Sequence, residues 1–421
     1  MIKKMLLAAT MLGGLCAGQA QADTTLRFVQ TNTSDESLAV LNTLIKKFET
    51  ENPGVKVELI SIPWDNSFEK FATMIAAGDI PDVAEMPDNW VALYANSGHL
   101  ENLEPYIAKW EHAGDLNGRA LELARKVKDT AYVIPYGFFV KSLYYNKKLL
   151  AEAGVAGPPK TVDEFMDAAK KVSALPGKSG YCLRGGSGAF NGWAMMGAAA
   201  NGDNAFFDKD GKSTLGDAGW VSGFQNQIDI YKNGWAPKDS VNWGYKETVA
   251  GFYTGTCAML DQDADVLAPT TEHMTPDEFG VVPMPKGKNG KSFPILTYGS
   301  WGIMAKSEHK DLAWKFLTLI DGPETDPMWT KAVGALPIFK SAEKDPAYAD
   351  PKYRAWFDTL ADKDAIPTIT PAYLPEYSLF AGSTAVKLGQ QALLGQITAQ
   401  DLGKQWGDIL SKAQQKYLAK K

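Results

Sequence analysis

The feature that most constrains the fold of this chain is a strand–helix–strand pattern at residues 24–59. Residues 24–29 alternate between apolar and polar side chains, as a strand with one buried face does. Apolar residues at helical spacing follow, and Pro53 and Gly54 end that helix before residues 55–59 alternate again. Two strands joined by a helix within about 35 residues form a βαβ unit, which implies a parallel sheet. The sequence therefore predicts an α/β fold.

Residues 1–22 are predicted to be a signal peptide and not part of the fold. Two lysines precede an apolar run at residues 5–15, and Ala20-Gln21-Ala22 is a small-x-small cleavage site. The apolar run is too short to span a membrane. We therefore expect export to the periplasm, cleavage after Ala22 and a mature chain that starts at Asp23.

The mature chain is acidic and long enough for two lobes. Without the two signal lysines, 41 basic residues face 49 acidic ones, and this net charge of −8 argues against nucleic acid as a partner. The length, 421 residues less the 22 of the signal, exceeds the ~100–200 residues of a usual domain. No other stretch approaches 18 apolar residues, so we expect no membrane-spanning segment. Cys182 and Cys257 are the only mature cysteines, and the sequence leaves open whether they pair.

Polar and aromatic residues follow the predicted strands at the points where those strands end. Ligands of open parallel sheets bind beyond the carboxyl ends of the strands, so we expect these residues to contact a ligand. Trp90 is expected either to cover a ligand or to brace its two polar neighbours from behind. For Asp88 the alternative is a turn after Pro87. The residues are Gln30, Thr31, Trp64, Asp88, Asn89 and Trp90.

Motifs for catalysis, cofactors and metals fail on inspection. The segment Gly185-Gly186-Ser187-Gly188-Ala189 misses the last glycine of a nucleophile elbow, and Pro285 stands where a phosphate-binding loop needs its first glycine. Residues 208–211 resemble calcium-loop material but lack the remaining oxygen ligands, so a hairpin turn explains them better. The four histidines show no metal spacing. We expect no catalytic residue, cofactor or metal.

Six segments, in order along the mature chain, resemble the maltose-binding-protein-like, family 1 extracellular solute-binding proteins of bacterial ABC importers. Each segment alone is weakly diagnostic, whereas the six together are typical of this family. They are IKKFETENPGVKVELI, AAGDIPDVAEM, YVIPYGFFVKSLYYNKKLLAEAG, PPKTVDEFMDAAKKV, GFYTGTCAML and GIMAKSEHKDLAWKFLTLI.

The resemblance implies a two-lobed periplasmic-binding-protein fold of type II, in which each lobe has a mostly parallel sheet flanked by helices. The ligand cleft lies between the lobes. The chain is expected to cross between them near Gly137, Tyr298 and Ala335. Residues 23–137 and 300–334 then form the N-terminal lobe, and residues 138–299 and 335–421 the C-terminal lobe. The resemblance also implies a carbohydrate or polyol ligand, a cognate permease as partner, no catalysis and a monomer.

Sugar recognition needs flat aromatic rings for C–H faces and planar polar groups for hydroxyls. The platforms we favour most are Trp193 and Trp301, because both are predicted to follow glycine-rich turns and to fall where the family lines its cleft. Further platforms are Trp64, Trp90, Phe138, Tyr298 and Tyr377. Polar contacts are expected from Asp88, Asn89, Arg184 and the loop Asp261-Gln262-Asp263.

Two alternatives stay open for the ligand and the activity. Arg184 could clamp an anionic sugar derivative (phosphorylated, sulfonated or uronic), or it could pair with Asp263. A secreted glycosidase would need two carboxylates, such as Asp88 and Asp263, ~5–10 Å apart. Phe139 stands where the maltose-binding relatives carry a cleft glutamate, which argues against malto-oligosaccharide as the ligand.

Overall fold

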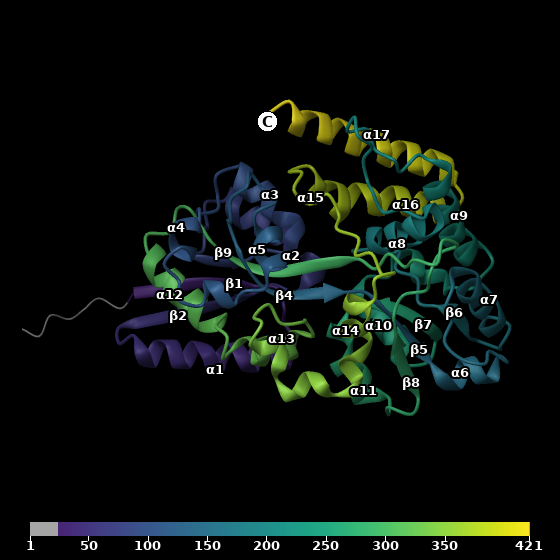
Figure 1. The fold of residues 1–421 in the computed structure, drawn as a ribbon, viewed down its shortest axis with the longest axis horizontal. Helices are drawn as coiled ribbons and strands as arrows, with labels where there is room; N and C mark the ends of the chain where they lie inside the picture. The colour runs from purple at the N-terminus through teal and green to yellow at the C-terminus, as the bar shows by residue number, and fades with distance from the viewer. Residues whose placement is uncertain (1–23, 421) are drawn as a thin grey trace, which may run out of the picture.

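The computed structural model describes residues 24–420, so the predicted signal peptide and its cleavage site lie outside the described residues. Two lobes lie side by side, and each is built around one β-sheet covered by helices (Figure 1). This architecture confirms the predicted two-lobed α/β fold.

The first lobe holds a five-stranded sheet in the order β2-β1-β3-β9-β4. Strand β1 pairs in parallel with β2 and β3, whereas β9 runs antiparallel to β3 and β4. The strands are β1 (Thr24–Gln30), β2 (Val55–Ser61), β3 (Val83–Glu85), β4 (Ile134–Val140) and β9 (Leu296–Ile303). The helices of this lobe are α1 (Asp35–Glu51), α2 (Trp64–Ala76), α3 (Asp88–Asn96), α4 (Glu104–Ile107), α5 (Gly118–Ala124), α12 (Lys310–Ile320) and α13 (Asp326–Val333).

The second lobe holds a four-stranded sheet in the order β6-β7-β5-β8. Strands β6 and β7 are parallel, and β5 runs antiparallel to β7 and β8. The prediction of a mostly parallel sheet is therefore wrong for this lobe. The strands are β5 (Ser142–Asn146), β6 (Ser179–Tyr181), β7 (Cys257–Gln262) and β8 (Phe279–Val282). The helices are α6 (Lys147–Glu152), α7 (Val162–Val172), α8 (Phe190–Asn201), α9 (Ala218–Lys232), α10 (Tyr245–Tyr253), α11 (Leu267–His273), α14 (Arg354–Ala361), α15 (Tyr377–Leu379), α16 (Ala385–Leu393) and α17 (Ala399–Leu418).

Helix α1 illustrates how local sequence sets the first βαβ unit. The hydroxyl of Ser34 accepts a hydrogen bond from the amide of Ser37, which caps the helix. Leu41, Leu44 and Phe48 lie on one face of α1 and are buried against the sheet. Burial of a large apolar side chain stabilises the fold by about 1.5–3 kcal/mol.

Three segments of the chain meet where the lobes join. Phe138 pairs with Tyr298 across β4 and β9, and it exchanges two backbone hydrogen bonds, of 3.0 and 2.8 Å, with Leu336. Gly137 allows this approach, because an added Cβ would lie 2.6 Å from the Cβ of Ala335. Beyond the junction, residues 337–344 pack back on the first lobe.

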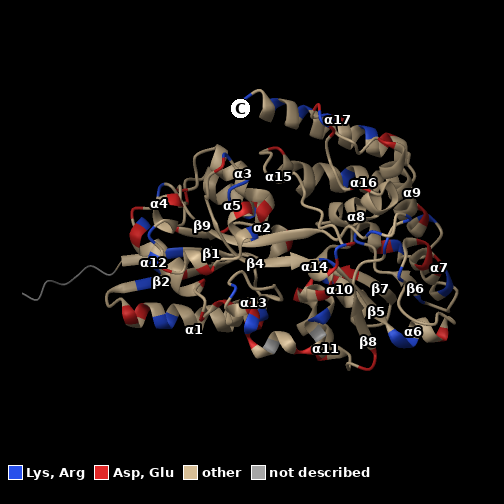
Figure 2. Ribbon diagram, in the orientation of Figure 1, with Lys and Arg blue, Asp and Glu red and all other residues tan. Residues whose placement is uncertain are grey.

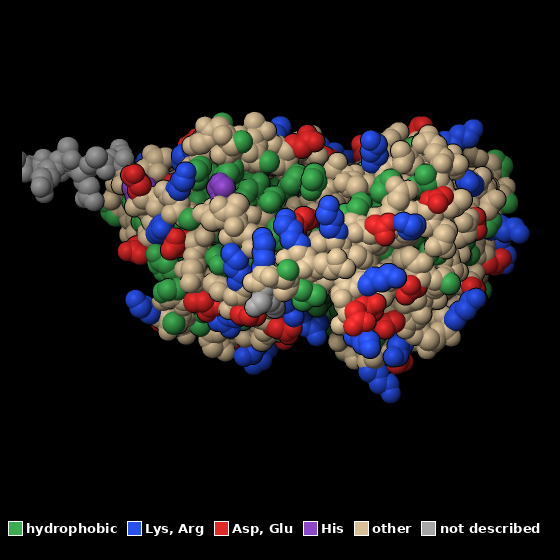
Figure 3. Space-filling view, turned by 90° about the horizontal axis from the view of Figure 1, so that it is seen from above, with side chains coloured by type: hydrophobic (Ala, Val, Ile, Leu, Met, Phe, Trp, Pro, Cys, Tyr) green, Lys and Arg blue, Asp and Glu red, His purple; other side chains and the backbone are tan. Residues whose placement is uncertain are grey.

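The lobes also touch on two sides away from this junction. The hydroxyl of Ser378 at α15 donates a hydrogen bond to the backbone carbonyl of Asn89 at α3. On the other side, a Cβ placed on Gly244 would lie 3.4 Å from a carboxylate oxygen of Asp65. Figure 3 shows the lobes from above as two bulges joined across a waist.

Charge is distributed over both lobes. Basic and acidic residues are interspersed along the ribbons of both lobes (Figure 2). Among residues 24–420, every helix is too short or too polar to cross a lipid bilayer.

Candidate ligand-binding site between the lobes

Gln30 lies at the carboxyl end of β1, at the edge of the sheet where a ligand is expected. Its side chain is fully buried, and its Oε1 accepts a hydrogen bond of 3.2 Å from the indole Nε1 of Trp301. This bond orients the amide and leaves Nε2 buried without a hydrogen-bond partner. Gln30 therefore presents a donor that a ligand oxygen could satisfy.

Thr31 is engaged in a buried network around Glu85, a residue that sequence reasoning missed. The amide and hydroxyl of Thr31 both donate to Glu85 at 2.6 Å, and the hydroxyl of Tyr136 donates to it at 2.5 Å. Burial raises the pKa of Glu85, although these hydrogen bonds act in the opposite direction. The signal in the sequence is a lone carboxylate at the end of a buried strand.

Asp88 and Asn89 begin helix α3 directly after Pro87. Oδ1 of Asp88 accepts a hydrogen bond of 2.8 Å from the amide of Asn89, as the turn alternative requires. Burial raises the pKa of Asp88 to about 7. Oδ1 of Asn89 is buried without a partner, so this side chain has an acceptor available for a ligand.

Tyr298 and Tyr377 lie close to Asp88, although they come from β9 and α15. Burial raises the pKa of both phenols, and the nearby charge of Asp88 raises them further. The structure therefore brings three predicted site residues together from three elements of two lobes. Both rings are largely buried, and Phe138 is buried at the junction of the lobes.

Trp90 lies in the core behind Asp88 and Asn89. Its ring is stacked on Phe71 at 5.8 Å and contacts Phe68 at 5.5 Å between centroids, and only 3% of the residue is exposed. Trp90 therefore braces Asp88 and Asn89 from behind and does not offer its ring to a ligand.

The expectation that both tryptophans follow glycine-rich turns is confirmed for Trp193, because Gly188 lies with φ +82° in the turn just before α8, and is wrong for Trp301. Trp301 lies within β9. Gly299, two residues before it, leaves room for the ring of Tyr136, which would be 2.2 Å from an added Cβ. The Trp301 ring is enclosed by Tyr136 at 4.6 Å and by Trp329 at 5.2 Å.

Trp193 lies in the first turn of α8 and packs on Phe224 and Trp406. Both favoured platforms are therefore buried among aromatic rings. Trp64, at the start of α2, is 42% exposed, unlike the buried tryptophans. Its neighbour Asp65 lies against Gly244 of the other lobe, which puts Trp64 at the rim between the lobes.

The second lobe contributes Asp261, Gln262 and Asp263 from the carboxyl end of β7. The ammonium of Lys141 forms a buried ion pair of 2.8 Å with Asp263 and also contacts the side-chain oxygen of Gln262. Nε2 of Gln262 is left buried without a partner. Sequence reasoning missed Lys141, whose signal is a single charge in the apolar run at residues 138–145.

Arg184 does not pair with Asp263, because Lys141 occupies that carboxylate. Its guanidinium lies over the ring of Tyr245, 5.7 Å from the centroid, and its Nη2 is buried without a partner. Burial raises the pKa of Asp261, which the charges of Lys141 and Arg184 oppose. Burial and the Asp263 carboxylate raise the pKa of Asp265 to about 7.

A small polar cavity connects these residues at the start of α8. It is lined by Lys141, Tyr181, Arg184, Asn191, Gln227 and Asp261, together with Trp193 and three residues without long side chains. The hydroxyl of Tyr181 donates a hydrogen bond to Asp261 in its wall.

The two sheet edges share one property that points to a ligand. Each presents buried polar atoms without a protein partner, and leaving such an atom unpaired costs about 1–3 kcal/mol. A polyhydroxylated molecule offers both donors and acceptors to such atoms. The atoms are Nε2 of Gln30, Oδ1 of Asn89, Nη2 of Arg184 and Nε2 of Gln262. Across residues 24–420, no group of three or more histidine, cysteine or acidic side chains is arranged to hold a metal ion.

Comparisons with known proteins identify relatives along most of the chain. The sequence profile of the family described as bacterial extracellular solute-binding protein matches residues 32–327. The mannitol-binding protein of Pseudomonas aeruginosa is 26% identical over 404 residues, covering 90% of this chain and 91% of that protein. The maltotriose-binding protein of Pyrococcus abyssi is 26% identical over 328 residues, covering 75% of this chain and 67% of that protein.

Solved structures share the fold. Maltose-bound MalE3 of T. maritima superposes with a TM-score of 0.81 at 22% identity, covering 92% of this chain and 99% of that one. A chitin oligosaccharide binding protein has a TM-score of 0.80 at 26% identity, covering 93% and 100%. Since the family profile spans more than half of the sequence, this chain belongs to the bacterial extracellular solute-binding proteins.

Proposed function

We propose that this protein is the substrate-binding component of an ABC importer and that it captures a carbohydrate or polyol between its lobes. The observation that carries the proposal is the set of unpartnered buried polar atoms on both sheet edges. A ligand that touches both edges stabilises the closed arrangement, and the permease then distinguishes the closed form from the open one. Capture at micromolar affinity needs only about 8 kcal/mol.

The charge of the site favours an uncharged ligand. Glu85 and Asp88 on the first lobe and Asp261, Asp263 and Asp265 on the second outnumber two basic residues, Lys141 and Arg184. Because burial raises the pKa of Asp88 and Asp265 to about 7, an anion would meet a net negative field mainly above that pH. The anionic alternative rests on one observation, the unpartnered Nη2 of Arg184.

The binding contacts that we propose come from both lobes. The first lobe would contribute Gln30, Asp88, Asn89 and Trp64, and the second would contribute Arg184, Asp261 and Gln262. We further propose that the lobes pivot where Phe138, Tyr298 and Leu336 meet, that the exported protein is a periplasmic monomer, and that no bond is made or broken in the ligand.

A titration series tests this function. Isothermal calorimetry and thermal shift are measured with D-mannitol, D-sorbitol, maltose, maltotriose, mannitol 1-phosphate and glucuronate, because a ligand that binds only the folded form raises its melting temperature. We expect binding of at least one neutral polyol or sugar. A response to the anionic compounds alone would favour the alternative, and turnover of a glycoside would overturn the proposal.

A further inference from the structure

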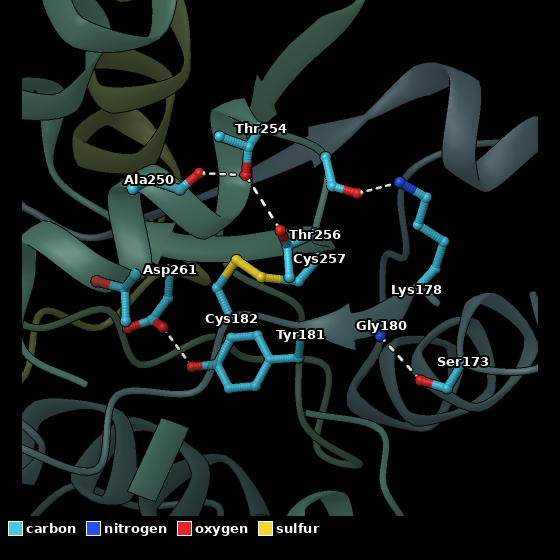
Figure 4. Close-up of a disulfide and its surroundings, with 12 residues drawn as sticks. Ser173, Lys178, Gly180, Tyr181, Cys182, Ala250, Thr254, Thr256, Cys257 and Asp261 are labelled. Atoms are coloured by element: carbon cyan, nitrogen blue, oxygen red, sulfur yellow. Dashed lines mark hydrogen bonds between the residues drawn. A yellow bond between two sulfur atoms is a disulfide. The ribbon is translucent and has the colours of Figure 1, made fainter. Parts of the chain in front are cut away.

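The disulfide between Cys182 and Cys257 lies beside the polar cavity of the second lobe. It joins β6 to β7 across a sequence separation of 75 residues, and both cysteines are fully buried. Cys182 stands between two cavity residues, Tyr181 before it and Arg184 two positions after it. Figure 4 shows Tyr181 reaching from this strand toward Asp261.

Strand β6 needs such a link because its own pairing is short. It is an edge strand of three residues with two register pairs on β7, Ser179 with Cys257 and Tyr181 with Met259. The amide of Cys182 adds one hydrogen bond of 2.8 Å to Met259 before the chain leaves the sheet. The amides of Gly180 and Tyr181 also donate to the carbonyl of Trp235 outside the sheet, but the register of β6 against Asp261 depends on its short pairing with β7.

The disulfide also contacts the helix on which Arg184 rests. A Cβ added to Gly251 in α10 would lie 3.2 Å from the sulfur of Cys257, so the sulfur packs directly on this helix. Tyr245, the first residue of α10, carries the guanidinium of Arg184 over its ring. The disulfide is therefore connected to Arg184 in two ways. Cys182 is two residues away along the chain, and the sulfur of Cys257 packs on α10, whose Tyr245 contacts the guanidinium.

We infer that the Cys182–Cys257 disulfide is a positioning element of the ligand site, which acts by holding Tyr181 and Arg184 in register with Asp261. The inference rests on the proposed function for its binding readout. In this role the bond contributes to ligand affinity separately from its contribution to overall stability.

A double-mutant cycle with D-mannitol as the probe tests the inference. Affinity is measured by calorimetry for the parent, for Cys182→Ser/Cys257→Ser, for Arg184→Gln and for their combination. We expect the cysteine variant to bind about 10-fold more weakly and Arg184→Gln to cost less than about 3-fold in that background, because residues that act as one unit are not additive. Gln30→Ala on the first lobe is the matched control, and its effect should be the same in both backgrounds. Full additivity with Arg184→Gln would overturn the inference.

Hydrogen exchange gives a readout that needs no ligand. We expect the amides of Cys182, Gly185 and Gly186 to exchange about 10-fold faster in the cysteine variant, while amides of β1 keep their protection. Unchanged exchange at these amides would overturn the inference. Cys182→Ala/Cys257→Val serves if the serine variant does not fold. If the parent fails to bind D-mannitol, the choice of probe is what fails, and hydrogen exchange alone decides the role of the disulfide.

Discussion

The indole nitrogen of Trp301 donates a 3.2 Å hydrogen bond to Oε1 of Gln30, and this bond links a buried core residue to the ligand edge of the first lobe. Because the indole N–H of Trp301 is bonded to Oε1, the side-chain amide of Gln30 is held in one orientation, and this orientation fixes where its unpartnered Nε2 points. Trp301 therefore acts on the site from within the core, although its ring offers no open face.

Two substitutions at Trp301 separate its packing from its hydrogen bond. Trp301→Ala should destabilise the empty protein by about 3–5 kcal/mol, since it removes a fully buried ring. Trp301→Phe keeps most of the ring and loses the N–H, so it should weaken binding by about 0.5–1.5 kcal/mol. Urea unfolding and calorimetric titration measure the two effects. A stable Trp301→Ala variant with weakened binding would instead make the ring a platform.

The buried carboxyl of Asp88 should make stability depend on pH. Its pKa is raised to about 7, whereas an unfolded aspartate titrates near about 3.9. Between these values the folded state binds more protons, so the free energy of unfolding falls as pH rises from about 4 to about 7. Asp88→Asn should remove this contribution and gain about 1–3 kcal/mol relative to the parent at pH 8, with little difference at pH 4; the lower part of that range allows for solvent screening. Urea unfolding of both proteins from pH 4 to pH 8 tests this, and parallel curves would contradict it.

Ligand affinity should also depend on the ionisation of Asp88, but it should rise with pH where stability falls. If ionised Asp88 accepts a ligand hydroxyl, binding strengthens as pH rises through about 7. Asp88→Ala should cost about 1–3 kcal/mol of binding at pH 8 and abolish this dependence. Calorimetry with D-mannitol across pH 5–8 measures it. Parental affinity in the variant would leave Asp88 with the turn role alone.

Trp64 is exposed, whereas Trp90, Trp193 and Trp301 are buried. Trp64→Ala should weaken binding by about 1–3 kcal/mol while the melting temperature of the empty protein stays within a degree or two. Leu394→Ala, at another exposed apolar side chain, is the control and should change neither quantity. Equal affinity of Trp64→Ala and the parent would remove Trp64 from the site.

The buried ion pair of Lys141 and Asp263 should be costly to break from one side. Lys141→Met leaves Asp263 and Gln262 without their cation and should destabilise the fold by about 3–5 kcal/mol. The exposed pair of Lys404 and Asp408 is the matched control, and Lys404→Met should leave the free energy of unfolding close to that of the parent. Chemical denaturation compares the two. Similar small costs would show that water reaches Lys141 freely.

Local patterns were enough to predict the elements that begin the fold. The alternation at residues 24–29 corresponds to β1, and the helix predicted to end before Pro53 and Gly54 corresponds to α1. The polar loop at residues 208–211 forms the expected turn, with the amide of Asp208 bonded to the carbonyl of Lys212. These features depend on neighbours a few residues apart, so the sequence contains all the information they need.

The positions of the tryptophans could not be predicted in the same way. Gly299 suggested a turn before Trp301, whereas it lies within β9 and gives space to the ring of Tyr136. A glycine required by a distant ring has the same local sequence as a glycine required by a turn. Likewise, Asp263 pairs with Lys141 over a separation of 122 residues, which no local pattern shows.

The sequence by itself determined the α/β class, the parallel start of the first sheet and the kind of residue that meets a ligand, because helix and strand periodicity and strand-end chemistry are local properties. Tertiary structure alone decided which of those residues are available. It buried Trp193 and Trp301 among rings and joined Cys182 to Cys257. It also left one polar atom each on Gln30, Asn89, Arg184 and Gln262 without a partner. The reason is physical: whether a polar atom is satisfied depends on every group packed around it, and those groups come from segments that only the folded chain brings together.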